Sequence, residues 1–328
     1  MAIRMVPGTT GMKWVWGVAL VALVLGGLHI GFNTNVFGAD RLCGGWLKSS
    51  DVEDVLDGSG RLSASGTDTV CTVKRSGLLV GGESTVTVRV AAEPAKYPFA
   101  MGEWAASSTL RLFTGPVAGG ADGRGGWAVL PSGCRVPQGV PSDGTDAKVA
   151  VVASVSGGAA DEGALARLLT AAAESTAADA GCQTKGSRAE LARPRTSSAG
   201  FAQVCDLPGF TIPAVTGQGG RATRAGFTGE LGKAWICDLA FADDQHGPYA
   251  RFAAVRDPLL SQGLPAAGAT RLDCPGGPVF VTVDDNAYPW DPAERKAAGL
   301  LPAKELLTRF TAVVTGALHC SPPASPRT

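Results

Sequence analysis

The chain has 328 residues, and its 29 lysine and arginine residues balance 29 aspartate and glutamate residues, so the formal net charge is zero. Because binding to nucleic-acid phosphates needs a basic surface, this balance argues against a nucleic-acid partner. About 290 residues follow the apolar N-terminal segment, which is enough sequence for two domains of ordinary size.

The apolar segment near the N-terminus predicts how the chain is exported. Residues Trp14 to Phe32 are almost wholly apolar. Arg4 and Lys13 precede them, and no acidic residue occurs before Asp40. A run of this length can span a bilayer, and the preceding positive charges favour a cytoplasmic N-terminus. We therefore expect a single-pass membrane anchor with extracellular domains after it. A signal peptide cleaved near Gly38, which would give a secreted protein, is the alternative.

The first half of the remaining chain predicts a short helix, several strands and a long closing helix. Ser50-x-x-Glu53 matches a capping box, which would begin the short helix. A Gly/Ser loop follows it. Strands are then predicted at 69–74, 84–91, 127–130 and 148–155, and the closing helix at 162–180. Strands followed by one amphipathic helix are typical of an α+β domain.

The second half predicts the same kind of domain. Strands are expected at 234–241, 250–255 and 279–283, and a helix at 303–318, with Pro302 in its first turn. Between the halves, the segment 185–202 combines basic residues with proline and serine, and we expect an exposed linker there. Each half is thus expected to be an antiparallel sheet with a C-terminal helix packed across it.

The eight cysteines divide into two sets of four with matching surroundings. The second cysteine of each set ends an apolar tripeptide, Thr69-Val70-Cys71 or Trp235-Ile236-Cys237. When the last cysteines of the sets are aligned, Leu168-Leu169-Thr170 falls on Leu306-Leu307-Thr308 without a gap. The sequence therefore predicts one four-cysteine domain used twice, as tandem repeats. The sets are Cys43, Cys71, Cys134 and Cys182, and Cys205, Cys237, Cys274 and Cys320.

The even number of cysteines indicates disulfides, which persist in oxidising compartments. No Cys-x-x-Cys spacing occurs, so we expect no metal site at these cysteines, and we expect no cofactor. Bridges confined to each set, with one pattern for both, leave three connectivities. We favour first-to-second and third-to-fourth pairing, because the third cysteine precedes a strand and the fourth ends the helix that would pack across it. This pairing joins Cys43 to Cys71, Cys134 to Cys182, Cys205 to Cys237 and Cys274 to Cys320.

These patterns predict a definite organisation along the chain. The expected ranges are a cytoplasmic N-terminus at 1–13, a transmembrane anchor or signal sequence at 14–32, a linker at 33–40, an extracytoplasmic repeat at 41–184, a linker at 185–202, a second repeat at 203–321 and a disordered tail at 322–328.

The opening of the first repeat resembles a known group of proteins. Cys43, Trp46-Leu47, the Ser50-x-x-Glu53 helix and Val70-Cys71 are followed by an alternating valine strand. This arrangement resembles secreted, cysteine-rich actinobacterial lipoproteins of unknown function. The resemblance implies an extracytoplasmic α+β domain and implies no catalytic residues. Cys43 lacks the small residues of a lipidation signal before it, so the apolar segment, rather than a lipid, is the expected tether.

Reactive side chains are sparse. The chain has three histidines, His29, His246 and His319, and neither a Gly-x-Ser-x-Gly elbow nor a His-Glu-x-x-His motif. We therefore expect no catalytic residues and no enzyme activity. An extracellular hydrolase with a dispersed site that uses His246 and nearby carboxylates is the alternative.

One loop is a candidate binding site. Asp284, Asp285, Tyr288 and Trp290 place acidic and aromatic side chains close together between a strand and the last helix. They could bind a cell-envelope protein, a glycan or a cation; alternatively, the two aromatic side chains cover the edge of the core. We expect a non-catalytic, membrane-tethered, extracytoplasmic module that binds an envelope component or supports an envelope complex.

Overall fold

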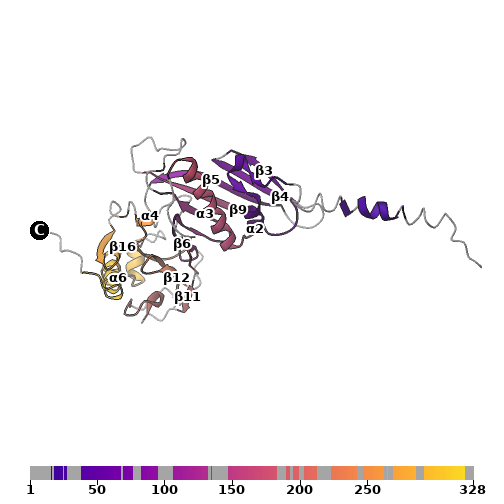
Figure 1. Ribbon diagram of the computed structural model, residues 1–328. Coiled ribbons are helices and arrows are strands. Elements are labelled where there is room, and N and C mark those ends of the chain that lie inside the picture. Colours follow the sequence, from indigo (N-terminus) through magenta and orange to yellow (C-terminus); the bar gives the residue numbers. More distant parts are fainter. Residues whose placement is uncertain are drawn as a thin grey trace, which may run out of the picture.

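The structure is a computed structural model, and it describes most of the chain. The described residues are 16, 18–24, 26–27, 38–67, 69–76, 83–94, 106–131, 134, 147–182, 190–192, 195–198, 203–212, 223–241, 247–261, 264, 269–285 and 292–321. Two large antiparallel sheets and two long helices form the folded body (Figure 1). We call the residues up to Ala192 the first half and those from Arg195 the second half.

The sheet of the first half has eight antiparallel strands in the order β10-β6-β7-β8-β9-β5-β4-β3. Its longest strand, β5, forms because β-branched valines alternate with polar residues, and Val86 and Val88 are fully buried on one side. The strands are β3 (Arg61–Gly66), β4 (Val70–Ser76), β5 (Ser84–Pro94), β6 (Arg111–Thr114), β7 (Ala118–Ala121), β8 (Gly125–Val129), β9 (Ala147–Ser156) and β10 (Glu190–Leu191).

The sheet of the second half has six antiparallel strands in the order β11-β12-β13-β14-β16-β15. Its central strand, β13, is buried along its whole length, which fits its apolar sequence. The strands are β11 (Arg195–Ser198), β12 (Thr223–Glu230), β13 (Ala234–Phe241), β14 (Ala250–Val255), β15 (Thr270–Cys274) and β16 (Gly277–Asp284).

Each sheet carries a long helix on its outer face. The helix α3 (Glu162–Asp179) begins where Asp161 Oδ1 accepts a hydrogen bond from the N–H of Ala164, at 2.8 Å. Its apolar stripe, which includes Leu165 and Leu169, packs on the first sheet. In the second half, Phe310 of α6 (Ala303–Ala317) is fully buried against the other sheet, where its ring stacks on Trp235 with centroids 5.5 Å apart.

The inner faces of the two sheets pack on each other. In β8, Ala128 points to α3, whereas its neighbours Trp127 and Val129 belong to an apolar layer shared with the second sheet. Ile236 of β13 and Val255 of β14 contribute to that layer from the other side. Because strand side chains alternate between faces, the body has four layers: helix, sheet, sheet and helix.

Shorter elements complete the fold. They are the two-stranded sheet of β1 (Arg41–Leu42) and β2 (Leu47–Lys48), the 3-10 turns η1 (Cys43–Gly45) and η2 (Val204–Asp206), and the helices α2 (Ser49–Val55), α4 (Pro258–Ser261) and α5 (Pro292–Ala297). The fold is α+β with antiparallel sheets, as expected from the sequence. However, the described residues form three sheets of two, eight and six strands rather than two matched repeats.

The predicted linker takes part in both large sheets. Within 185–202, β10 pairs with β6 and β11 pairs with β12. The segment thus supplies an edge strand to each sheet, which pairs backbone groups that an edge would otherwise expose to solvent. Arg195 of β11 lies over the ring of Phe227, 4.7 Å from its centroid.

The predicted capping box is wrong. The helix α2 begins at Ser49, so Ser50 lies inside the helix, and the side chain of the N-cap residue Lys48 makes no capping hydrogen bond. Pairing of β2 with β1 brings the chain beside Asp40, and both the N–H and the hydroxyl of Ser49 donate to the Asp40 carbonyl. The strand pairing therefore places the start of the helix one residue before Ser50.

The structure has four disulfides, and they join the pairs favoured by the sequence: Cys43–Cys71, Cys134–Cys182, Cys205–Cys237 and Cys274–Cys320. The first bridge of each half joins a 3-10 turn to an interior strand of the sheet, β4 or β13. Cys43 and Cys205 both have left-handed backbone conformations, with φ of 47° and 53°. This conformation is unfavourable for a residue with a Cβ, so both turns are held by their surroundings.

The apolar N-terminal segment is described in part. Trp16, Val18–Val24, Gly26 and Gly27 are helical, and the rest of 14–32 lies outside the described residues. Among the residues described, no helix is both long and apolar enough to cross a membrane.

Candidate functional site

One face of the first sheet is polar and lies outside the packed layers. In β3, β4 and β5, the side chains that point to α2 and α3 are apolar and buried, including Leu62, Val73 and Val86. Most of the opposite side chains are hydroxyl-bearing or charged, and the apolar exceptions are Val70, which is exposed, and Ala91, which is buried. The described residues that the first sheet contributes to the layer between the sheets come from β6 to β9 and from Ala91, near the end of β5. Figure 1 shows β3 and β4 at the end of the sheet farthest from α6.

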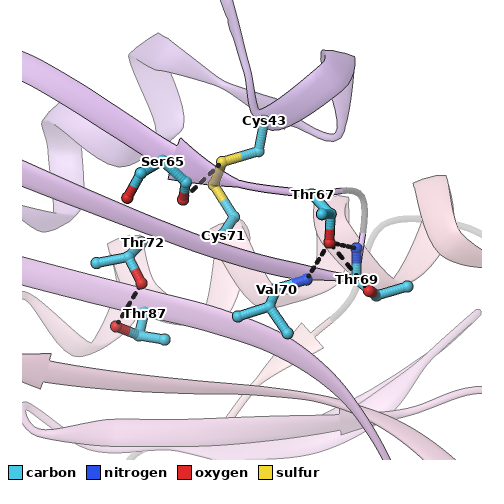
Figure 2. The surroundings of a disulfide bond; sticks show 8 residues. All are labelled: Cys43, Ser65, Thr67, Thr69, Val70, Cys71, Thr72 and Thr87. Atoms are coloured by element: carbon cyan, nitrogen blue, oxygen red, sulfur yellow. Dashed lines mark hydrogen bonds between the residues drawn. A yellow bond between two sulfur atoms is a disulfide. The ribbon is translucent and has the colours of Figure 1, made fainter. Parts of the chain in front are cut away.

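Hydroxyl side chains form a row across this face. Ser65, Thr72, Thr87 and Ser154 are direct cross-strand partners on β3, β4, β5 and β9. The hydroxyls of Thr72 and Thr87 lie 3.2 Å apart and share a hydrogen bond. Figure 2 shows these two side chains facing each other near the Cys43–Cys71 disulfide. Because residues paired across a sheet point to the same side, all four side chains occupy one face.

A second row runs parallel to the first. Ser63, Lys74, Thr85 and Ser156 are cross-strand partners on the same four strands. We call the two rows together the hydroxyl face. Lys74 forms an ion pair with Glu83 at 2.8 Å, so its charge is balanced locally.

The cavity beside the hydroxyl face has a volume of about 450 Å³, which is large enough for a small ligand. Thr87 and Ser154 line it from the hydroxyl face, and Arg89 and Arg124 line it as well. Trp127 and Val152 also line it and are almost wholly buried. The cavity therefore combines hydroxyls and two guanidinium groups with an apolar base. Leu110, Asp122, Gly125, Gly126 and Ala153 complete the described lining.

The turn between β7 and β8 positions Arg124. Asp122 Oδ1 accepts hydrogen bonds from the N–H groups of Arg124 and Gly125, at 2.7 and 2.9 Å. The carbonyl of Arg124 accepts from the N–H of Val155 in β9, at 2.7 Å. These bonds hold the backbone of the turn beside Ser154.

The chemistry of the cavity suits binding by hydrogen bonds and charge. Of the described lining residues, Asp122 alone has a carboxylate, and one of its oxygens already accepts two backbone hydrogen bonds. Histidine and cysteine are both missing from that described lining, and the described part of the chain holds no cluster of three or more His, Cys, Asp or Glu that could bind a metal ion. The arrangement can donate to and accept from a polar ligand, and two of its lining residues are arginines.

The loop predicted as a binding site is placed in part. Asp284 ends β16, and Asp285 forms an ion pair with Arg295 of α5 at 3.5 Å. Arg295 also donates to the carbonyls of Asp285 and Tyr249. Asp285 thus fastens α5 to the sheet. Tyr288 and Trp290 lie outside the described residues, as does His246.

Two buried titratable groups lie near these elements in the second half. Burial raises the pKa of the Tyr249 hydroxyl well above its usual range, so the side chain is neutral, and its ring packs on Phe241. Burial also raises the pKa of the Asp257 carboxyl, while hydrogen bonds from the N–H groups of Leu259 and Leu260 oppose that shift. Asp257 begins the helix α4, so we assign it a structural role.

Another cavity, of about 290 Å³, lies beside β10 and β11, where the chain passes from the first sheet to the second. Its charged lining residues are Arg195, Glu230 and Lys233. Lys233 pairs with Glu230 at 3.1 Å, and Arg195 packs on Phe227. The hydroxyl face has two rows of mostly hydroxyl side chains and adjoins the larger of these two cavities, so it is the stronger candidate site.

Sequence reasoning missed the hydroxyl face. We used the alternation in β5 to identify a valine core, but the opposite side of the same strand reads Thr85, Thr87, Arg89. This polar alternation is the signal that could have indicated the site. No protein-family model, no curated protein and no solved structure matches the chain, so the resemblance to actinobacterial lipoproteins stays a prediction.

Proposed function

We propose that the protein is a non-catalytic, extracytoplasmic binding module that holds a glycan of the cell envelope on its hydroxyl face. The observation that carries this proposal is the row Ser65, Thr72, Thr87 and Ser154. Neighbouring strands lie about 4.8 Å apart, so the row repeats hydroxyl groups on the scale of one sugar ring. Each hydroxyl donates one hydrogen bond and accepts others, as the hydroxyls of a sugar do.

The location outside the cytoplasm is part of the proposal. Four disulfides support an oxidising compartment. The apolar side chains Trp16, Leu20 and Leu23 are helical and exposed, at 72%, 65% and 74%, which supports a membrane tether formed by this segment. A cleaved signal peptide would leave the same module secreted.

We further propose that the two halves are copies of one unit. The strand order β3-β4-β5-β9-β8 of the first half corresponds to β12-β13-β14-β16-β15 of the second. In each half, the first disulfide is attached to the second strand in this order, which is β4 or β13. The second disulfide joins the end of the closing helix, α3 or α6, to the residues just before the fourth strand, β9 or β16. An internal duplication accounts for all three correspondences.

Binding to bacterial cell-wall material tests the glycan proposal. The full-length protein, purified in detergent, is sedimented with cell walls of a high-GC Gram-positive bacterium, and the bound fraction is measured. We expect the double variant Thr72→Val and Thr87→Val to bind at least tenfold more weakly, because it removes two hydroxyls and keeps the side-chain shape. Release of soluble sugar by the wild type would instead favour the hydrolase.

The control is Thr308→Val, which removes an exposed hydroxyl from α6 on the second half. This variant should bind as the wild type does. Equal binding by the wild type and the Thr72/Thr87 double variant, or no binding by the wild type, would overturn the proposal.

A further inference from the structure

Building on the proposed function, we infer that the cavity beside the hydroxyl face binds an N-acetylated amino sugar of the glycan. In this arrangement the acetyl methyl group packs on the apolar base of the cavity, which includes Trp127 and Val152. The hydroxyls of Thr87 and Ser154, which line the same cavity, bind the amide of the acetamido group. The apolar and the polar end of one substituent thus have matching surroundings in one place.

A glycine leaves room for the sugar at the end of the hydroxyl row. Ser154 of β9 pairs across the sheet with Gly125 of β8, so the next position of the row carries no side chain. A Cβ at Gly125 would lie 2.8 Å from the carbonyl oxygen of Ala153, so the close approach of β9 keeps this position free of a side chain. The cavity therefore lies in line with the hydroxyls that would bind the rest of the glycan.

The neighbouring row of side chains is apolar at the cavity. Val152 lies two residues before Ser154 on β9 and pairs across the sheet with Trp127, so all three side chains point to the same side. Trp127 is 2% exposed, and Val152 and Leu110 are each 6% exposed. These three apolar residues belong to the layer between the sheets. The cavity thus lies where the hydroxyl face meets the edge of that apolar layer.

An uncharged group suits the polar residues of the cavity. Arg89 already interacts with another group within the protein, and one oxygen of Asp122 accepts two backbone hydrogen bonds. An acetamido group has one N–H donor and one carbonyl acceptor, and serine and threonine hydroxyls can serve both. Its methyl group also gains affinity by leaving water for an apolar surface, whereas a sugar hydroxyl at the same place would be buried against side chains that cannot bind it.

Two soluble tetrasaccharides with the same β-linked backbone test the inference. Cellotetraose has a hydroxyl on the second carbon of each sugar, where tetra-N-acetylchitotetraose has an acetamido group. Titration calorimetry with the full-length protein in detergent measures both affinities. We expect the acetylated sugar to bind about tenfold more tightly, because it buries a methyl group and keeps its amide hydrogen-bonded. Equal affinities, tighter binding of cellotetraose, or no binding of the acetylated sugar would overturn the inference.

A variant of the apolar base assigns the preference to the cavity. Val152→Thr keeps the size of the side chain but places a hydroxyl against the acetyl methyl group. The preference for the acetylated sugar should fall about fivefold, while binding of cellotetraose stays unchanged. The matched control is Val70→Thr, because Val70 lies in the same row two strands away, is 44% exposed and is not among the residues that line the cavity. This control should keep the wild-type preference.

Failure of this inference can be distinguished from failure of the proposed function. If the Thr72/Thr87 double variant loses wall binding while the wild type binds both tetrasaccharides equally, the glycan function stands and the acetamido site is wrong. A full wild-type preference in folded Val152→Thr also overturns the site, and if this variant does not fold, the wild-type comparison decides. Preference for the acetylated sugar without wall binding would leave the site standing and overturn the envelope as its source. If the wild type binds neither walls nor the acetylated sugar, both proposals are wrong.

Discussion

The residue that follows the second cysteine of each half has opposite surroundings in the two halves. In the first half, Thr72 pairs across the strands with Thr87, and their hydroxyls share a hydrogen bond on an open face. In the second half, Asp238 pairs with Arg251 through two hydrogen bonds of 2.6 and 3.2 Å, and Asp238 is only 8% exposed. Similar strand frameworks thus present a polar surface in one half and a buried ion pair in the other.

The rest of each row continues the contrast. Thr87 is followed across the sheet by Ser154, whereas Arg251 is followed by Asp284. On the other side, Asp238 pairs with Gly226, where a Cβ would lie 2.7 Å from the Ser108 hydroxyl. Ser108 comes from the first half, and its N–H donates to Asp238 Oδ2 at 2.9 Å. The row that contains Asp238 and Arg251 in the second half therefore binds the first half.

Extra strands in the first half explain the difference. The hairpin of β6 and β7 has no counterpart among the described residues of the second half, and its Leu112 and Ala118 help to form the layer between the sheets. The second sheet packs over this hairpin and its neighbours. The hydroxyl face remains outside the layer because the sheet is wider than its partner. Whether the other half packs over a row, rather than the order of the strands, decides which row is open to a ligand.

The largest expected effect on stability comes from removing the buried ion pair between Asp238 and Arg251. Asp238→Ala should lower the free energy of unfolding by about 3–5 kcal/mol, because it leaves the Arg251 guanidinium buried without its carboxylate. The matching change on the open row, Thr72→Ala, should cost about 0.5–1 kcal/mol, since water can replace the lost hydroxyl. Urea denaturation of both variants measures the two values.

A double variant sharpens this test. Asp238→Ala combined with Arg251→Ala should recover part of the loss, because no unpaired charge remains. Similar costs for Asp238→Ala and Thr72→Ala would show that the two rows are equally exposed to solvent and would contradict the comparison.

The corresponding disulfides should have matched effects. The Cys43–Cys71 and Cys205–Cys237 bridges span 28 and 32 residues, and chain entropy predicts about 3–4 kcal/mol of stability from each. Changing either pair to alanine should therefore lower stability by amounts that agree within about 1 kcal/mol. Denaturation under non-reducing conditions measures both, and a loss from one pair only would mean that the halves are not stabilised alike.

The smallest expected effect concerns α4, a helix found in the second half alone among the residues described. Because burial raises the pKa of Asp257, the folded state holds this proton more tightly than the unfolded state. The stabilising contribution is present below the unfolded pKa and is lost as the pH rises through the folded pKa.

Asp257→Asn keeps an oxygen to accept the hydrogen bonds of Leu259 and Leu260 but removes the titration. Between about pH 4 and pH 7, the wild type should lose stability relative to this variant. Denaturation midpoints across that range provide the measurement. A difference between the two proteins that does not change with pH would contradict a raised pKa.

Sequence patterns predicted the apolar strands best. The expected bounds of β13 and β14 match the structure at both ends, because long runs of apolar and β-branched residues leave few alternatives. The glycine-rich β7 was missed, since glycine carries no strand signal. At Gly126 in the neighbouring β8, a Cβ would lie 2.5 Å from the carbonyl oxygen of Gly120 and 2.8 Å from Ala121 Cα, so the close approach of the β7 backbone requires glycine there.

The sequence by itself determined the main strands, the two closing helices and the cysteine partners, because hydrophobic period and local order along the chain specify them. Only the tertiary structure decided which sheet face is open. Thr87 and Arg251 both alternate with apolar neighbours in their strands, and nothing local distinguishes an exposed side chain from one buried beneath another sheet. That distinction depends on how the two sheets pack, which is set by residues far apart in the chain.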